Sequence, residues 1–293
     1  MSFAIVTDTS ANLPSNFLKQ QGVALVPYTY RCRGSEHSCP DEARFDGRRF
    51  YEAMRSGMEV RTSLISPQRY AGCFREILAA GQDLLFVGMS SGISSSQHCA
   101  AMAAEGLAAE FPMRRLRLVD SLGASLGEGL LVMRAAEMRA HGAGLDETAD
   151  ALEQLRRRMY QLFTVDDLIH LRRGGRLSNA AAILGTVLQI KPLLKGDPEG
   201  KIVASGKVRG RRQVIEAMAA RYAELVEGAG SQTVGIAHAD CAADAHRLAS
   251  LLRAASCPPK EILTVMYEPV TGSHVGPGAL ALFFFGGEGV REC

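Results

Sequence analysis

Two short stretches contain residues whose types and spacing could do chemistry. Gly88-Met89-Ser90-Ser91-Gly92 has the Gly-x-Ser-x-Gly spacing of a nucleophilic serine at a strand-to-helix turn. The stretch 271–278 places one imidazole, His274, among glycines and small residues, where it can exchange a proton near neutral pH. Ser90, an acid such as Asp120, and either His238 or His274 follow the Ser, Asp, His order of an α/β-hydrolase. One hypothesis is therefore a serine hydrolase of lipid esters that uses Ser90.

Each stretch also has an interpretation without catalysis. A serine- and glycine-rich turn is typical of a helix N-terminus, whose free N–H groups bind an anion with no covalent step. For an isolated imidazole such as His274, a hydrogen-bonded turn histidine is the favoured interpretation. No His-Gly-Gly-Gly segment precedes Ser90 to supply the oxyanion site that a hydrolase needs. We therefore favour the anion-binding interpretation of the serine turn.

Apolar strands alternating with helical patterns must position these residues, and this alternation predicts an α/β fold with a parallel sheet flanked by helices. Ligands of such sheets collect beyond the carboxyl ends of the strands, so we expect the turns at Asp8, 62–63, 90–96 and Asp120 to form the functional edge. The predicted strands are 3–7, 23–28, 84–87, 116–120, 233–237, 262–267 and 279–285, and the predicted helices are 46–55, 67–79, 95–109, 125–141, 146–158, 209–227 and 240–254.

Length and charge predict two domains and no overall attraction to a polyelectrolyte. The 293 residues, 47% of them hydrophobic, exceed the usual size of one core, and a change of composition near Phe163 predicts domains at 1–162 and 163–293. The net charge is +2, but 156–212 contains 13 Lys and Arg against 4 Asp and Glu, a balance of +9. This segment is consistent with a solvated face, with partner docking, or with a nucleic-acid-binding module whose binding is sensitive to salt.

Several classes of protein are not supported by the sequence. Neither the Gly-x-x-x-x-Gly-Lys-Ser/Thr loop nor a strand-linked Gly-x-Gly-x-x-Gly is present, so we expect no nucleotide cofactor. Cys32, His37 and Cys39 lack a fourth metal ligand at a usual spacing, so we also expect no metal. Seven scattered cysteines, no signal peptide pattern and no apolar run of membrane-spanning length predict a soluble, cytoplasmic protein with reduced thiols and no integral membrane segment.

Eight segments in a fixed order give the chain a specific resemblance to the DegV family, the bacterial fatty-acid-binding proteins that serve as the acyl-carrying subunit of fatty acid kinase. The resemblance covers the whole length. The segments are Asp8-Thr9-Ser10-Ala11-Asn12-Leu13-Pro14, Thr62-Ser63-Leu64-Ile65-Ser66-Pro67, the turn 90–97, Asp120-Ser121-Leu122-Gly123-Ala124-Ser125-Leu126-Gly127, Leu171-Arg172-Arg173-Gly174-Gly175-Arg176-Leu177-Ser178, Lys191-Pro192-Leu193-Leu194, Lys207-Val208-Arg209-Gly210 and His274-Val275-Gly276-Pro277-Gly278-Ala279-Leu280.

The resemblance implies two α/β domains, the second with a mixed sheet, that hold a long-chain fatty acid between them. It implies a non-catalytic carrier in phospholipid synthesis, with a separate ATP-dependent kinase that forms the acyl phosphate and no nucleic-acid partner. By position, the residues that bind the fatty-acid carboxylate are Thr62, Ser63, Ser94, Ser95 and His274. Arg172, Arg173 and Arg176 lie in the segment associated with the kinase.

One departure from the family pattern concerns the turn itself. Relatives commonly have Ser-Gly-Thr where this chain has Ser94-Ser95-Ser96, so Ser95 occupies a glycine position at which a backbone N–H is the expected donor. Charge-assisted hydrogen bonds from hydroxyls, N–H groups and an imidazole can compensate a carboxylate removed from water. The apolar stretches 180–190 and 279–285 are candidate walls for the acyl chain, and plain core is the alternative for both.

Overall fold

The computed structural model describes residues 3–177 and 190–293, and the contacts among them define two compact units. The first unit comprises Met1–Phe45 and Arg61–Arg156, and the second comprises Asp46–Val60 and Arg157–Cys293. The ranges predicted from sequence, 1–162 and 163–293, differ from this division in two places. Residues 46–60 pack with the second unit, and a boundary after residue 162 would cut through strand β8 (Met159–Thr164), whose partners all lie in the second unit.

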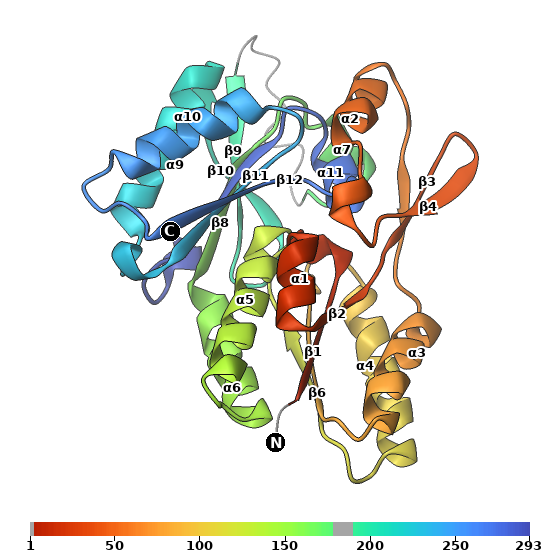
Figure 1. Cartoon of the computed structure of the whole chain (residues 1–293). Helices are drawn as coiled ribbons and strands as arrows, with labels where there is room; N and C mark the ends of the chain where they lie inside the picture. The colour runs from red at the N-terminus through yellow and green to blue at the C-terminus, as the bar shows by residue number, and fades with distance from the viewer. Residues whose placement is uncertain (1–2, 178–189) are drawn as a thin grey trace. The chain divides into compact units, whose positions relative to one another are not determined.

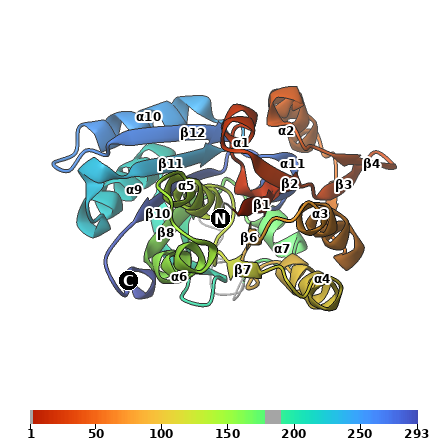
Figure 2. The ribbon, with the colours of Figure 1, turned by 60° about the horizontal axis from the view of Figure 1, so that its bottom comes forward.

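A four-stranded parallel sheet in the order β2-β1-β6-β7 forms the centre of the first unit. Figure 2 shows α5 and α6 on one face of this sheet and α3 and α4 on the other. Because helices cover both faces, all of β6 is buried, which explains its continuous apolar sequence. The elements are β1 (Ala4–Asp8), α1 (Ser15–Gln21), β2 (Val23–Val26), α3 (Pro67–Ala79), β6 (Leu84–Gly88), α4 (Ser96–Glu110), β7 (Leu116–Asp120), α5 (Leu126–Ala140) and α6 (Leu145–Leu155).

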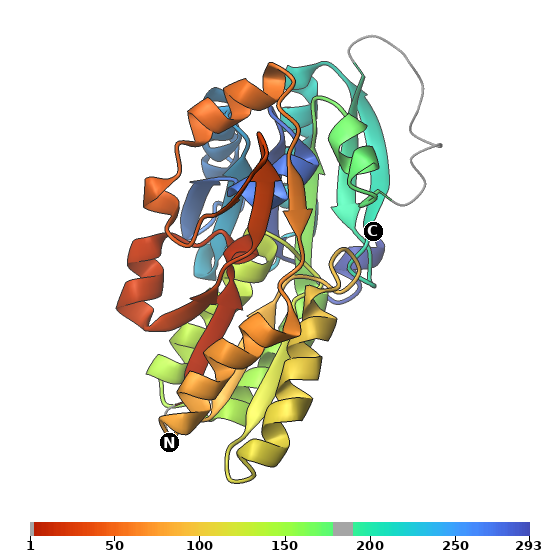
Figure 3. The ribbon, with the colours of Figure 1, turned by 90° about the vertical axis from the view of Figure 1, so that its right-hand side faces the viewer.

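A small antiparallel sheet in the order β4-β3-β5 also belongs to the first unit (Figure 3). It consists of β3 (Thr29–Cys32), β4 (Ser35–Ser38) and β5 (Arg61–Ser63). The placement of Thr62 and Ser63 in a loop was therefore wrong, because both residues pair with β3, opposite Tyr30 and Thr29. The loop begins after them and ends at Ser66, whose hydroxyl accepts the Arg69 N–H at 3.4 Å and caps α3 as the sequence predicts.

The second unit is built on a mixed six-stranded sheet in the order β10-β9-β8-β13-β11-β12. Only β11 and β12 run parallel; the other neighbours are antiparallel. Figure 1 shows α9 and α10 side by side along this sheet. The α/β class with a parallel and a mixed sheet is thus confirmed. The remaining elements are α2 (Gly47–Arg55), α7 (Ile169–Arg173), β9 (Ile190–Gly196), β10 (Ile202–Arg209), α9 (Arg211–Leu225), β11 (Thr233–His238), α10 (Ala242–Arg253), β12 (Glu261–Met266), α11 (Pro269–Val275) and β13 (Leu280–Phe285).

Alternate residues of β13 belong to the core of the second unit. Fewer residues of 279–285 are therefore available to line the acyl chain than the sequence suggested. Leu280, Leu282 and Phe284 are buried with residues of α9 and α10, and the Phe284 ring packs against Tyr160 and Tyr222 at centroid distances of 5.3 and 5.2 Å. Only the opposite-facing positions of β13 can line anything else, since side chains alternate across a strand. Of the other predicted wall, residues 180–189 lie outside the described residues.

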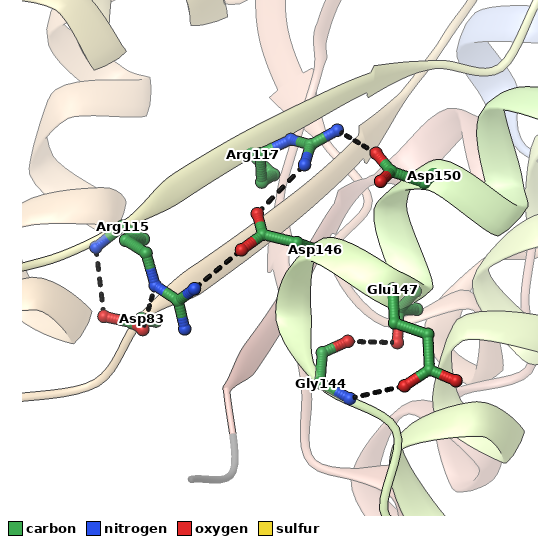
Figure 4. A network of polar contacts seen from close by, with 8 residues as sticks. Asp83, Arg115, Arg117, Gly144, Asp146, Glu147 and Asp150 are labelled. Carbon is green, nitrogen blue, oxygen red and sulfur yellow. Dashed lines mark hydrogen bonds and ion pairs between the residues drawn. The ribbon is translucent and has the colours of Figure 1, made fainter.

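Charged pairs hold the amino-terminal ends of β6 and β7 in the first unit (Figure 4). Arg115 binds Asp83 through its backbone N–H at 3.0 Å and its side chain at 3.1 Å, and its Nη1 donates to Asp146 at 2.6 Å. Arg117 donates to Asp146 at 2.9 Å and to Asp150 at 2.6 Å. These pairs connect β7 to α6, and hydrogen bonds from Arg117 to Asp150 and Asp146 raise the pKa of Arg117.

Candidate functional site

The serine turn between β6 and α4 presents a partly buried hydroxyl with fixed neighbours. Ser94 N–H donates to Ser90 O at 3.1 Å, which closes the turn. Ser94 Oγ accepts the N–H of Ser96 at 3.2 Å and lies 3.2 Å from the hydroxyl of Tyr28. Ser95 is exposed and makes no side-chain cap to α4. The turn therefore offers a hydroxyl and the first N–H groups of a helix, an arrangement that suits an anion.

A hydrogen bond joins this turn to the chain that follows Thr62 and Ser63. The backbone N–H of Ile65 donates to Ser96 Oγ at 3.1 Å, and both residues are buried. Thr62 is partly buried in β5, and Ser63 is exposed. The two hydroxyl-bearing segments thus meet within the first unit, because this hydrogen bond lies two residues after Ser63 and two residues after Ser94.

A pair of buried carboxyl groups lies at the carboxyl end of β1. Asp8, Ser10 and Glu128 each have 0% exposure. Ser10 Oγ lies 2.5 Å from Asp8 Oδ1 and 2.5 Å from Glu128 Oε2, and Thr7 Oγ1 donates to Glu128 Oε1 at 2.8 Å. A hydroxyl has one proton to donate, so one of the two short contacts requires a proton on a carboxyl group. Burial raises the pKa of Asp8 to about 6, so Asp8 holds a proton more tightly than an exposed aspartate does.

Ser90 does not have the surroundings of a nucleophile within the first unit. Its side chain has 0% exposure, and Ser90 Oγ accepts the N–H of Gly92 at 3.1 Å. Asp120, the acid proposed for a triad, instead accepts hydrogen bonds from Ser91 Oγ at 2.6 Å and from Leu122 N–H at 3.0 Å. Because a triad acid must orient a histidine, this arrangement favours the anion-binding turn over the hydrolase.

His274 lies in the short helix α11 of the second unit, although the glycines around it are typical of a loop. Pro269 opens this helix, and the Glu268 carboxylate accepts the Val270 N–H at 2.6 Å and the Thr271 N–H. An acidic cap followed by proline is a helix-start signal that the sequence contains and that the prediction missed. His274 is thus held on a capped helix beyond the carboxyl end of β12.

The segment with the clustered arginines packs against this helix through contacts between histidines and glycines. A Cβ atom at Gly174 would overlap His274 Nδ1, and one at Gly276 would overlap the His170 ring. Arg176 donates to Gly174 O, and burial together with the Arg176 charge lowers the pKa of His274 to about 4. The imidazole is therefore neutral at physiological pH, and it donates one N–H.

Arg172 and Arg173 of the same segment lie on α7 and are exposed, whereas Arg176 is partly buried. Several other cations of the +9 segment are paired. Lys191 contacts Asp166 at 2.7 Å, and Arg211 contacts Asp244 at 2.9 Å. The balance of +9 therefore overstates the positive charge that this segment presents to a partner. Neither arginine of α7 forms an ion pair within the described residues.

The cysteine-bearing hairpin of the first unit shows no sign of a metal centre. His37 stacks on Tyr30, with ring centroids 5.4 Å apart. Residues 3–177 and 190–293 contain no group of three or more His, Cys, Asp or Glu side chains placed to hold a metal ion. Within the same ranges, no helix combines the length and the apolar sequence needed to cross a membrane.

Tyr28 and Glu128 were not among the predicted site residues, although Tyr28 lies beside Ser94 and Glu128 contacts Ser10 in the predicted turn after Asp8. Tyr28 ends an apolar strand and so resembled a core residue, and Glu128 is 120 residues from Asp8 in the sequence. The spacing of residues in the sequence does not predict a contact between side chains that far apart in the chain. The motif that begins at Asp8 is the one sequence feature that could have drawn attention to the cluster.

Comparisons with known proteins agree over the whole length of the chain. A family model described as "Uncharacterised protein, DegV family" matches residues 2–286. A DegV domain-containing protein of Clostridium perfringens is 33% identical over 284 residues, which cover 97% of each chain. A structure described as fatty acid binding of a DegV family protein from Thermus thermophilus has a TM-score of 0.87 and 31% identity, covering 98% of this chain and 100% of that one. DegV of Bacillus subtilis, described as a fatty acid binding protein, has a TM-score of 0.81 and 27% identity, covering 98% and 100%.

Proposed function

The chain belongs to the DegV family, and on that premise we propose that it binds a long-chain fatty acid and acts as a carrier without catalysing a reaction itself. The observation that carries the proposal is the full-length likeness to the fatty-acid-binding DegV protein of Thermus thermophilus, at a TM-score of 0.87. The serine turn adds chemical support, because a partly buried hydroxyl beside a helix N-terminus suits a carboxylate.

The proposed head-group donors are Thr62, Ser63, Ser94, Ser95 and His274. All are neutral, since His274 has a pKa of about 4, Thr62, Ser63 and Ser94 donate through hydroxyls, and Ser95 is expected to donate through its backbone N–H. Neutral donors compensate a buried carboxylate by hydrogen bonds and leave most of its negative charge on its own oxygens. The acyl chain supplies most of the affinity, at ~0.8 kcal/mol for each buried methylene.

A separate ATP-dependent kinase is the proposed partner. The kinase would transfer the terminal phosphoryl group of ATP to a carboxylate oxygen, which gives an acyl phosphate and ADP. Arg172 and Arg173 on α7 are exposed and form no ion pair within the described residues, which suits them to docking, and Arg176 lies beside the proposed ligand histidine. This partnership predicts that Arg172→Ala with Arg173→Ala lowers acyl-phosphate formation and leaves fatty-acid binding intact.

Native mass spectrometry of the full chain tests the carrier proposal. Protein produced in bacteria should retain one fatty acid under gentle conditions, and Ser94→Ala and His274→Ala should each reduce that occupancy without unfolding the protein. Arg134→Ala, which removes an exposed ion pair with Glu137 on α5, is the matched control and should keep full occupancy. A wild-type protein that carries and binds no fatty acid would contradict the proposal, and stoichiometric labelling of Ser90 by a fluorophosphonate would favour the hydrolase.

A further inference from the structure

Tyr28 is fixed at both its backbone and its hydroxyl. It follows β2, and its side chain is 3% exposed. The Tyr28 N–H donates to Thr9 Oγ1 at 3.1 Å, and the Tyr28 hydroxyl lies 3.2 Å from Ser94 Oγ and 3.9 Å from Met89 Sδ. The phenol ring therefore spans from the turn after β1 to the serine turn after β6.

The number of protons at Ser94 restricts how this hydroxyl can act. Ser94 Oγ already accepts the N–H of Ser96 at 3.2 Å, and it has a single proton of its own to donate. If Ser94 donates that proton to Tyr28, none remains for a ligand. A carboxylate only accepts hydrogen bonds, so Ser94 can bind one only when Tyr28 is the donor in their contact.

We propose that Tyr28 is a positioning residue for the carboxylate site: it donates its hydroxyl proton to Ser94 Oγ and thereby directs the Ser94 proton to the ligand. This inference rests on the proposed function. The direction of the hydrogen bond would reverse between two states. Before a carboxylate binds, Ser94 can donate to Tyr28 and Tyr28 to Met89 Sδ, a weak acceptor; with a carboxylate bound, Tyr28 donates to Ser94 and Ser94 donates to the ligand.

The surroundings keep Tyr28 in the form that the proposal needs. Burial raises the pKa of Tyr28 well above its ordinary value. The phenol therefore stays protonated at neutral pH, and it remains able to donate.

A double-mutant cycle on the delipidated full chain tests this role. The variants are Tyr28→Phe, Ser94→Ala and the double variant, and the probes are hexadecanoic acid and hexadecan-1-ol, measured by isothermal titration. Tyr28→Phe should weaken binding of the acid about 5- to 10-fold, the effect of one hydrogen bond. Binding of the alcohol should not change, because its hydroxyl can accept the Ser94 proton when Tyr28 donates to Ser94, and can donate to Ser94 Oγ when that contact is absent. In the Ser94→Ala background, Tyr28→Phe should have no further effect on the acid.

Tyr70→Phe is the matched control. Tyr70 is a fully buried tyrosine of the same unit, and its hydroxyl has no hydrogen-bond partner among the described residues. This variant should bind both probes as the wild type does. If Tyr28→Phe binds the acid normally while Ser94→Ala is weakened, the inference is overturned and the proposed function survives. Equal losses for acid and alcohol would indicate packing and also overturn it, whereas normal binding by Ser94→Ala would reject both the inference and the proposed site.

Discussion

The two ends of the parallel sheet in the first unit carry different kinds of polar group. At the amino-terminal end, Arg115 and Arg117 pair with aspartates, and the side chains of Arg115 and Asp146 are 59% and 48% exposed. At the carboxyl end, hydroxyls and carboxyls that are 0% exposed, those of Asp8, Ser10 and Glu128, interact with one another.

Solvent exposure explains why the two ends differ. Exposed ion pairs are compensated by water as well as by each other, so each contributes little to stability. Buried polar groups depend entirely on their protein partners, and leaving one unpaired costs a large desolvation penalty. The amino-terminal end should therefore tolerate substitution, and the carboxyl end, where α/β sheets bind ligands, should not.

The largest effect is expected for Glu128→Ala. This substitution removes the carboxylate that accepts from the buried Thr7 and Ser10 hydroxyls and opens a cavity, so it should lower the free energy of unfolding by about 3 kcal/mol or more. Glu128→Gln is the matched control, since its amide can accept from Thr7 and donate to Ser10. Urea denaturation of the two variants should differ by most of that amount, and equal stability would contradict the role given to the carboxyl pair.

The second effect is a pH dependence due to Asp8. Its pKa is about 6 in the folded protein against an ordinary value of 3.8, so the folded state holds the proton more tightly than the unfolded chain. The stabilisation is complete below pH 4 and is lost as pH rises through 6, a change of about 3 kcal/mol at 1.36 kcal/mol per pKa unit.

Asp8→Asn isolates this contribution, because the asparagine does not titrate in this range. The stability of the variant minus that of the wild type should rise by about that amount between pH 4 and pH 7. Urea denaturation across this range measures the difference. A flat difference would show that Asp8 does not retain its proton in the folded state.

Gly174→Ala should displace the neutral imidazole of His274, with a smaller loss of stability than Glu128→Ala. Its Cβ would overlap His274 Nδ1, so the imidazole must move, and fatty-acid affinity should fall about tenfold for a cost in stability of about 1–2 kcal/mol. Gly175→Ala is the control, because Gly175 has a φ of +68° and open space around it. That variant should lose about 1 kcal/mol of stability through backbone strain alone and keep its affinity. Equal fatty-acid affinities in the two variants would show that His274 does not contribute to binding the ligand.

The smallest effect is expected at the amino-terminal end of the sheet. Asp146→Asn removes the charge that pairs with Arg115 and Arg117, and it should lower the free energy of unfolding by under about 1 kcal/mol. The loss should shrink further when salt is added to the buffer, and fatty-acid affinity should stay at the wild-type value. A loss of stability as large as that of Glu128→Ala would contradict the expectation that the amino-terminal end of the sheet tolerates substitution better than the carboxyl end.

Local patterns carried much of the fold. The continuous apolar sequence of β6 and the Ser66-Pro67 start of α3 predicted those elements, because burial and helix capping act on neighbouring residues. His274 shows where such reasoning failed, since glycines indicated a loop although Glu268 and Pro269 start a helix. The prediction of a loop at Thr62 and Ser63 failed for another reason. The strand β5 forms by pairing with β3, some 30 residues earlier in the sequence.

The sequence by itself determined the α/β class, the order of the motifs and the resemblance that leads to a fatty acid, because these depend on residue types and local spacing. Only the tertiary structure decided which of the polar residues meet. Tyr28 contacts Ser94, and the Ser10 hydroxyl contacts both Asp8 and Glu128. These contacts join residues from separate strands and helices. Such contacts follow from the pairing and packing of whole elements, which bring together side chains that are 66 and 118 positions apart.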